Sequence, residues 1–187
     1  SGMFAGNTQL TSIVNLNKFE TLNVSNMANM FKDCSALTAL DLSSFDTQWI
    51  SNFSSMFEAC SNLQTITKTT NFKIEGYTNA SSMFRNCSSL ATLDLSTFDL
   101  SNAYGYGNML EWMSALTDLY TPNKVGNSEI FLPKDMYKNG SSEKIKKIAA
   151  NTNYSFRLKS SQWSSALCCL EAGTQIAMAD GTMKNIE

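Results

Sequence analysis

Histidine is absent from the 187-residue sequence. This absence removes the usual general base at neutral pH and the most common metal ligand of proteins. Neither a Ser-His-Asp nor a Cys-His mechanism can be built from this chain alone. We therefore expect a protein that is not an enzyme and that needs no metal and no cofactor.

Charged residues are also scarce, at 16% of the sequence, and the net charge is -2. A nucleic-acid partner is not expected, because there is no basic excess to neutralise phosphates. No apolar run approaches the ~18 residues needed to span a bilayer, and no signal peptide is visible. The apolar fraction of 43% argues against disorder and predicts a domain with a sizeable core.

A repeat of 26–27 residues is the strongest feature that is present. Met-Phe pairs, the last one Met-Leu, recur at offsets of 27, 26, 27 and 26 residues, and each Met is followed by two further apolar columns. A period of ~20–29 residues with an L-x-x-L-x-L core is the signature of leucine-rich repeats. The columns are Met3, Met30, Met56, Met83 and Met109; Leu10, Leu37, Leu63, Leu90 and Leu116; and Ile13, Leu40, Ile66, Leu93 and Leu119.

Each unit combines two apolar periods. In residues 27–34 the apolar side chains follow the i, i+3, i+4, i+7 spacing of one helix face, and Ser25 stands at the N-cap position. The alternation in residues 40–42 is typical of a short, half-buried strand. We predict an α/β fold, a leucine-rich-repeat solenoid of about five strand-plus-short-helix units.

Three parts of the chain are expected. The repeats cover residues 1–122. Residues 123–163, with expected strands at 130–133 and 154–158 and an expected helix at 141–149, would form a C-terminal cap. Residues 164–187 would form a linker and a terminal β-hairpin, because Asp180-Gly181 is a strong two-residue turn signal.

Two segments carry a specific resemblance. Residues 54–63 (SSMFEACSNL) and 93–99 (LDLSTFD) closely resemble the BspA-type leucine-rich repeats of bacterial cell-surface proteins. The resemblance implies a right-handed solenoid that is extracellular or displayed on the cell surface. It also implies a role in adhesion or host contact, with a protein or a glycan as ligand.

The last twenty residues, CCLEAGTQIAMADGTMKNIE, have a different relationship. They resemble the first block of the intein and hedgehog Hint family, in which Cys169 matches the nucleophile and Cys168–Cys169 the scissile bond. The later blocks, with the essential His and terminal Asn, are missing, so we expect no cleavage here. The resemblance nevertheless implies an alternative function, in which this chain is the passenger of an autoprocessing precursor. The hairpin is also expected to pack against the C-terminal cap of its own chain or to pair with a strand edge of a neighbouring copy.

The three repeat cysteines, Cys34, Cys60 and Cys87, form one column on the expected helix face. A disulfide or metal ladder is one interpretation. Neighbouring helices lie ~8–10 Å apart, however, which exceeds the ~7 Å limit between the Cα atoms of a disulfide. We predict reduced thiols within the core.

The exposed column of the expected sheet supplies the candidate binding residues. It holds Asp41, Thr67, Asp94 and Tyr120, after Val14 in the first unit. Two carboxylates two strands apart lie ~10 Å from each other, beyond the usual range for an inverting glycosidase, so binding is favoured over catalysis. Tyr104 and Tyr106 are further candidates near its C-terminal end, with packing in the cap as the alternative.

Overall fold

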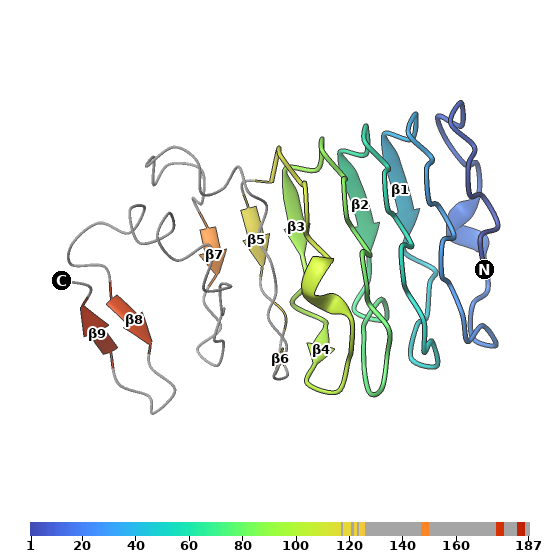
Figure 1. The fold of residues 1–187 in the computed structure, drawn as a ribbon. Helices are drawn as coiled ribbons and strands as arrows, with labels where there is room; N and C mark the ends of the chain where they lie inside the picture. The colour runs from blue at the N-terminus through green and yellow to red at the C-terminus, as the bar shows by residue number, and fades with distance from the viewer. Residues whose placement is uncertain are drawn as a thin grey trace.

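The computed structural model describes residues 1–116, 118–120, 122, 124–125, 147–149, 175–177 and 183–185. Within this part of the chain, successive repeat units lie side by side (Figure 1). Equivalent strands pair in parallel with a register shift of 26 residues, for example Ala39 with Thr65 and Thr92 with Asp118. The repeat in the sequence is therefore also a repeat in space.

The strands are short and belong to separate sheets. One sheet contains β1 and β2, a second has the order β3-β5-β7, a third pairs β4 with β6, and β8 pairs antiparallel with β9. Two 3-10 turns, η1 (Leu16–Lys18) and η2 (Tyr106–Asn108), are also present. The strand bounds are β1 (Ala39–Leu42), β2 (Thr65–Lys68), β3 (Thr92–Asp94), β4 (Asp99–Leu100), β5 (Asp118–Tyr120), β6 (Lys124–Val125), β7 (Lys147–Ala149), β8 (Gln175–Ala177) and β9 (Met183–Asn185).

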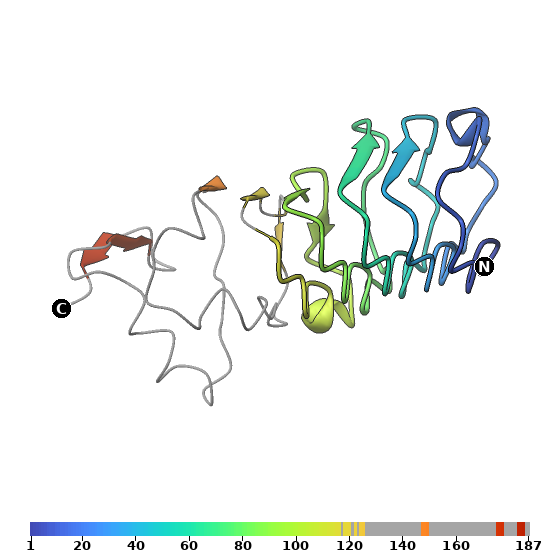
Figure 2. The same ribbon diagram turned by 90° about the horizontal axis from the view of Figure 1, so that it is seen from above.

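A ribbon of consecutive β-turns runs along the side opposite the strands, as Figure 2 shows from above. We call residues 27–34, 53–60 and 80–87 the turn ribbon. In the first of these segments, the N–H groups of Met30, Lys32 and Cys34 donate to the carbonyl three residues earlier. The intervening N–H groups of Asn29 and Phe31 donate to Ser54 and Met56 of the next unit, both at 2.9 Å.

This alternation satisfies the backbone without a helix. Half of the N–H groups close local turns, and the other half bind the neighbouring unit. Asn26 directly precedes the first segment, and its Oδ1 accepts the N–H of Ala28 at 2.9 Å; Asn52 and Asn79 accept the N–H groups of Ser54 and Ser81 in the same way. Buried peptide groups need such partners, so the ladder both shapes each unit and joins it to the next.

Left-handed residues explain why the helix does not form. Asn29 and Asp33 have φ values of 58° and 60°, and the two following units repeat this conformation. A left-handed residue every four positions is incompatible with a right-handed helix, and Asn and Asp tolerate it better than most residues. Gly2 and Gly6 stand at the matching positions of the first unit. The equivalent pairs are Ser55 and Ala59, then Ser82 and Asn86.

The predicted α/β leucine-rich-repeat solenoid is therefore wrong. The described residues contain no α-helix, and their strands form small separate sheets rather than one continuous sheet. The expected N-cap at Ser25 is wrong too, because no helix follows it; its carbonyl accepts the N–H of Ser51 at 2.9 Å. Residues 147–149, expected in a helix, form β7. The expected strands at 130–133 and 154–158 lie outside the described residues.

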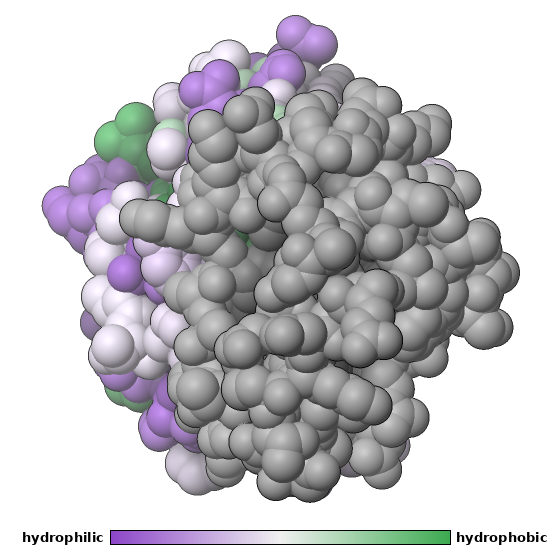
Figure 3. All heavy atoms as spheres, turned by 90° about the vertical axis from the view of Figure 1, so that its left-hand side faces the viewer, coloured by the Kyte–Doolittle hydropathy of each residue, from purple (hydrophilic) through white to green (hydrophobic). Residues whose placement is uncertain are grey.

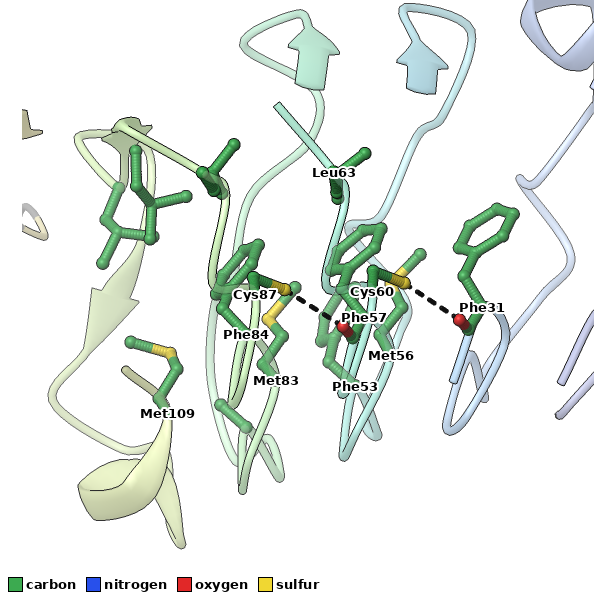
Figure 4. Close-up of a cluster of buried hydrophobic side chains, with 14 of the residues drawn as sticks. Phe31, Phe53, Met56, Phe57, Cys60, Leu63, Met83, Phe84, Cys87 and Met109 are labelled. Carbon is green, nitrogen blue, oxygen red and sulfur yellow. Dashed lines mark hydrogen bonds between the residues drawn. The ribbon is translucent and has the colours of Figure 1, made fainter. Parts of the chain in front are cut away.

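The core is nevertheless built from most of the predicted columns, whereas Met3 of the first unit is 66% exposed. Met27, Met30, Phe31 and Cys34 are all buried, because a ribbon of turns points the same i, i+3, i+4, i+7 positions inward. Equivalent phenylalanines stack from unit to unit, with ring centroids 5.4, 5.7 and 5.2 Å apart along Phe4, Phe31, Phe57 and Phe84. Figure 4 shows part of this stack beside the cysteine column.

The cysteines are free and buried, as predicted. Each thiol donates to a carbonyl of the preceding unit: Cys60 Sγ lies 3.0 Å from Phe31 O, and Cys87 Sγ lies 3.1 Å from Phe57 O (Figure 4). Burial raises the pKa of Cys60 to about 12 and also raises that of Cys87. Both thiols stay protonated, so they act as donors between units.

Charges alternate along the outer face of the turn ribbon. Glu58 accepts from Lys32 Nζ at 2.9 Å and lies 3.4 Å from Arg85 Nη1, and Arg85 Nε reaches Glu111 at 2.9 Å. Burial raises the pKa of Glu58, but the hydrogen bonds from Lys32 and Ser55 and the two cationic neighbours outweigh this effect and lower it. This row ties together four neighbouring units.

Replacing a left-handed alanine by glycine tests the turn ribbon. Ala59 has φ 60°, a conformation that costs an L-residue ~1–2 kcal/mol and costs glycine little. Ala59→Gly should raise the free energy of unfolding by ~0.5–1 kcal/mol in urea titrations, net of the entropy of the unfolded chain. Ala115, which is not left-handed, is the control, and Ala115→Gly should lower it by ~0.5–1 kcal/mol. An equal loss of unfolding free energy in both variants would contradict the left-handed conformation of Ala59 in the turn ribbon.

The charge row predicts a pH-dependent contribution. Glu58→Gln should lower the free energy of unfolding by ~1 kcal/mol at pH 7, because Lys32 and Arg85 lose a charged acceptor. Folding lowers the pKa of Glu58, so its stabilisation is present above the ordinary value of 4.5 and is lost as the pH falls through the folded value. Glu75→Gln, in an exposed pair with Lys73, should have no such effect. A deficit in Glu58→Gln that is independent of pH would refute this account.

Candidate functional site

The structure divides the predicted binding column into two pairs. Asp41 lies opposite Thr67 in the β1–β2 register, and Asp94 lies opposite Tyr120 in the β3–β5 register. Tyr104 is exposed and forms a bridge with Asn79, away from these strands. Tyr106 is 0% exposed and begins η2, so its side chain belongs to the core.

Both carboxylates of the column hold strand ends in place. Asp41 Oδ1 accepts the N–H of Ser43 at 3.0 Å, and Asp94 Oδ1 accepts the N–H of Ser96 at 2.8 Å. Hydrogen bonds from Ser43 lower the pKa of Asp41. For Asp94, burial raises the pKa, but the bonds from Ser96 and the charge of Lys68 outweigh it and lower it. Both groups are ionised at neutral pH, so neither is suited to be a general acid.

The unit that contains β2 departs from its neighbours at two positions. Lys68 occupies the column in which the flanking units have Leu42 and Leu95, both fully buried. One additional residue stands between Thr67 and Phe72, compared with the spacing from Asp41 to Phe45. A lysine cannot leave its ammonium group in an apolar core without a partner. Its Nζ lies 3.3 Å from Asp94 Oδ2 and 3.3 Å from Thr97 Oγ1 of the next unit.

The sheet is interrupted beside this lysine. β2 is an edge of one sheet and β3 is an edge of the next, and no backbone hydrogen bond joins these two strands, all of whose residues are described. A cleft of about 420 Å³ lies between them. Its volume falls within the range of small-ligand pockets. The lining residues are Phe57, Gln64, Thr65, Ile66, Thr67, Lys68, Phe72, Phe84, Ala91, Thr92, Leu93, Asp94 and Phe98.

The two units stay together on their other sides. On the turn ribbon, Phe57 N–H donates to Met83 O at 2.9 Å. Beyond the strands, Thr97 Oγ1 donates to Phe72 O at 2.7 Å, and Asp99 N–H donates to Ile74 O at 2.8 Å. The cleft is therefore a local opening on the strand side of a stack that is otherwise continuous.

The cleft has a polar rim above an apolar floor. Its floor contains the phenyl rings of Phe57, Phe72, Phe84 and Phe98, which are at most 2% exposed. Lys68 bridges the gap, with a side chain that is 14% exposed, whereas its partner Asp94 is 44% exposed. The side chain of Lys68 is thus the less exposed member of the pair.

Exposed aromatic residues gather elsewhere. Tyr77 and Tyr104 stack with ring centroids 4.8 Å apart, and Arg85 lies 4.5 Å above the ring of Trp112. None of these four residues lines the cleft. In the end view of Figure 3, the coloured part of the surface is mostly hydrophilic or intermediate, with isolated hydrophobic side chains.

Sequence reasoning selected Thr67 and Asp94 but missed Lys68 and the cleft. The available signal was a single lysine in a column of leucines, together with the longer spacing to Phe72. Among the described residues, no three His, Cys, Asp or Glu side chains are grouped to hold a metal ion. No helix in the same part of the chain is long and apolar enough to cross a membrane. Cys168 and Cys169 lie outside the described residues.

Restoring the leucine column tests the origin of the cleft. Lys68→Leu should raise the free energy of unfolding by ~1–2 kcal/mol, because a leucine gains burial beside Leu42 and Leu95. The lost pair with the half-exposed Asp94 contributes less than this. Lys73→Leu, outside the cleft, should bring no gain. Equal effects of the two substitutions in urea unfolding would show that Lys68 does not interrupt the column.

The comparisons with known proteins assign a family. Residues 1–122 match the family described as Mycoplasma protein of unknown function, DUF285. No curated protein and no solved structure matches the chain. The match covers all the units that build the turn ribbon and the cleft, and more than half of the 187 residues. The chain therefore belongs to the DUF285 family.

Proposed function

We propose that this chain is a non-catalytic binding module that takes its ligand, a protein or a glycan, at the cleft between β2 and β3. The observation that carries the proposal is the interruption of the sheet at Lys68. Two strand edges without a backbone bond between them, a cleft of about 420 Å³ and a bridging ion pair coincide at one place. Thr67 and Asp94 from the candidate column lie at its rim.

Two observations support binding rather than catalysis. The sequence has no histidine to act as a general base. The carboxylates of Asp41 and Asp94 accept backbone N–H groups of Ser43 and Ser96, and they belong to strands of different sheets. This arrangement positions strand ends and places Asp41 and Asp94 on different sheets.

We also propose that the module is displayed at the cell surface. The resemblance of residues 54–63 and 93–99 to BspA-type surface proteins supports this location and a role in adhesion. The low content of charge, at 16%, is compatible with a surface rich in Ser, Thr and Asn. Such hydroxyl and amide groups suit contacts with neutral partners better than with polyanions.

A second candidate function rests on the tail. The resemblance of residues 168–187 to the first Hint block, together with the antiparallel β8–β9 pair, supports a passenger role in an autoprocessing precursor. The two functions are compatible, since a binding module can be the passenger. Intact mass spectrometry at neutral pH with added thiol distinguishes an active first step from an inert segment. A fragment ending at Cys168 that disappears in Cys169→Ala would demonstrate processing.

A binding screen tests the cleft as the ligand site. The full chain would be applied to a glycan array and to a panel of extracellular-matrix proteins, together with Lys68→Leu and the control Lys73→Leu. Lys68→Leu is expected to close the cleft and to stabilise the chain, so it should weaken binding at least tenfold, whereas Lys73→Leu should not. Ligands bound equally by all three proteins would place the site elsewhere and contradict the proposal.

A further inference from the structure

We infer that the cleft takes an extended polypeptide segment, which enters as an additional strand and joins β2 to β3. This inference rests on the proposed function and specifies the class of ligand. It follows from the two strand edges, from the charge of Lys68 and from the absence of an exposed ring in the cleft.

The walls of the cleft are strand edges. β2 ends the sheet of β1, and β3 ends the sheet of β5 and β7, so each has only one strand neighbour among the described residues. An open edge presents a row of backbone groups that bind another strand, which is the basis of recognition by strand addition. Here two such edges border one cleft, and the proposed strand would pair with both.

The direction of the backbone groups of β3 agrees with this geometry. Leu95 N–H donates to Tyr120 O of β5 at 2.9 Å. Successive residues of a strand direct their N–H and C=O groups to opposite sides. The backbone groups of Thr92 and Asp94 therefore point away from β5, toward β2. They are the donors and acceptors that an inserted strand would meet.

The two edges also run in the same direction. β2 is parallel to β1 and β3 is parallel to β5, and Figure 1 shows β2 and β3 pointing the same way. An inserted strand consequently meets both walls in one orientation, and its alternate residues bind to β2 and to β3. Its inward side chains would face Ile66 and Leu93 above the phenyl floor.

Lys68 selects for an acidic residue in the ligand. Its ammonium group crosses the path of an inserted strand to reach Asp94. Insertion separates the pair, after which Asp94, 44% exposed, regains water, while Lys68, 14% exposed, keeps only the neutral hydroxyl of Thr97 as an acceptor. A carboxylate from the ligand restores the ion pair inside the cleft, and a neutral ligand leaves the ammonium group poorly solvated.

A sugar fits the cleft less well. Glycans bind with their apolar ring faces against exposed aromatic side chains, and the four phenyl rings of the cleft lie at its bottom, at most 2% exposed. The exposed rings of Tyr77 and Tyr104 are not among the residues that line it. Backbone pairing, rather than ring stacking, is what the walls offer.

The test starts from a library of random heptapeptides displayed on phage. Selection is made on the full chain, with counter-selection on Lys68→Leu, whose fold is checked by thermal unfolding. The selected peptides should alternate apolar and polar residues and carry Asp or Glu near one end. They should bind Lys68→Leu at least tenfold more weakly than the wild type, and Lys73→Leu equally well.

N-methylation of a selected peptide then separates insertion from simple edge addition. Methyl groups on the odd-numbered amides and on the even-numbered amides should each weaken binding at least tenfold, because an inserted strand bonds on both sides. Loss of binding with only one of the two sets would show addition to a single edge and overturn the inference.

The remaining outcomes distinguish this inference from the function on which it rests. A glycan that binds the wild type but not Lys68→Leu, without any selected peptide, would overturn the peptide ligand and leave the cleft as the binding site. If no peptide, glycan or matrix protein separates wild type from Lys68→Leu, both proposals are contradicted.

Discussion

The structure depends on the backbone hydrogen bonds between units along the turn ribbon. Every second N–H group in residues 27–34 and 53–60 donates to the next unit, and the groups between them close local turns. Because this ladder involves the main chain, it tolerates changes in side chains from one unit to the next. The buried phenylalanine stack and the cysteine donors then fill the space that the ladder defines.

The position of the ladder explains how a cleft can exist within a continuous stack. Units that are bonded along the turn ribbon and again beyond the strands do not need an unbroken sheet. The unit of β2 uses this freedom, since Lys68 replaces a buried leucine and its ammonium group is partnered across the gap by Asp94. A polar residue in an apolar column and one additional residue before Phe72 thus coincide with the separation of the two strands, while the rest of the unit remains in place.

The sequence predicted the inward-facing residues better than their conformation. Met27, Met30, Phe31 and Cys34 are buried as expected, because a helix and a ribbon of turns bring the same spacing to one face. The prediction of a helix was wrong, because the spacing of apolar residues carries no information about the sign of φ. The glycines at positions 2 and 6, aligned with Asn29 and Asp33, were the signal for left-handed residues. The cleft was not predicted because Thr67 and Asp94 were considered as members of one continuous column, which the break after β2 divides.

Amide hydrogen exchange, measured by NMR on the full chain, tests the central claim most directly. A ladder along the turn ribbon with an open edge at β3 predicts slow exchange at Asn29, Phe31 and Leu95, whose N–H groups donate to the next unit. At the end of β3, Asp94 should exchange much faster than the next residue, Leu95, because the N–H of Asp94 faces the cleft. Equal protection of Asp94 and Leu95 would mean that β2 and β3 pair in solution, and rapid exchange at Asn29 and Phe31 would mean that the turn ribbon does not hold the units together.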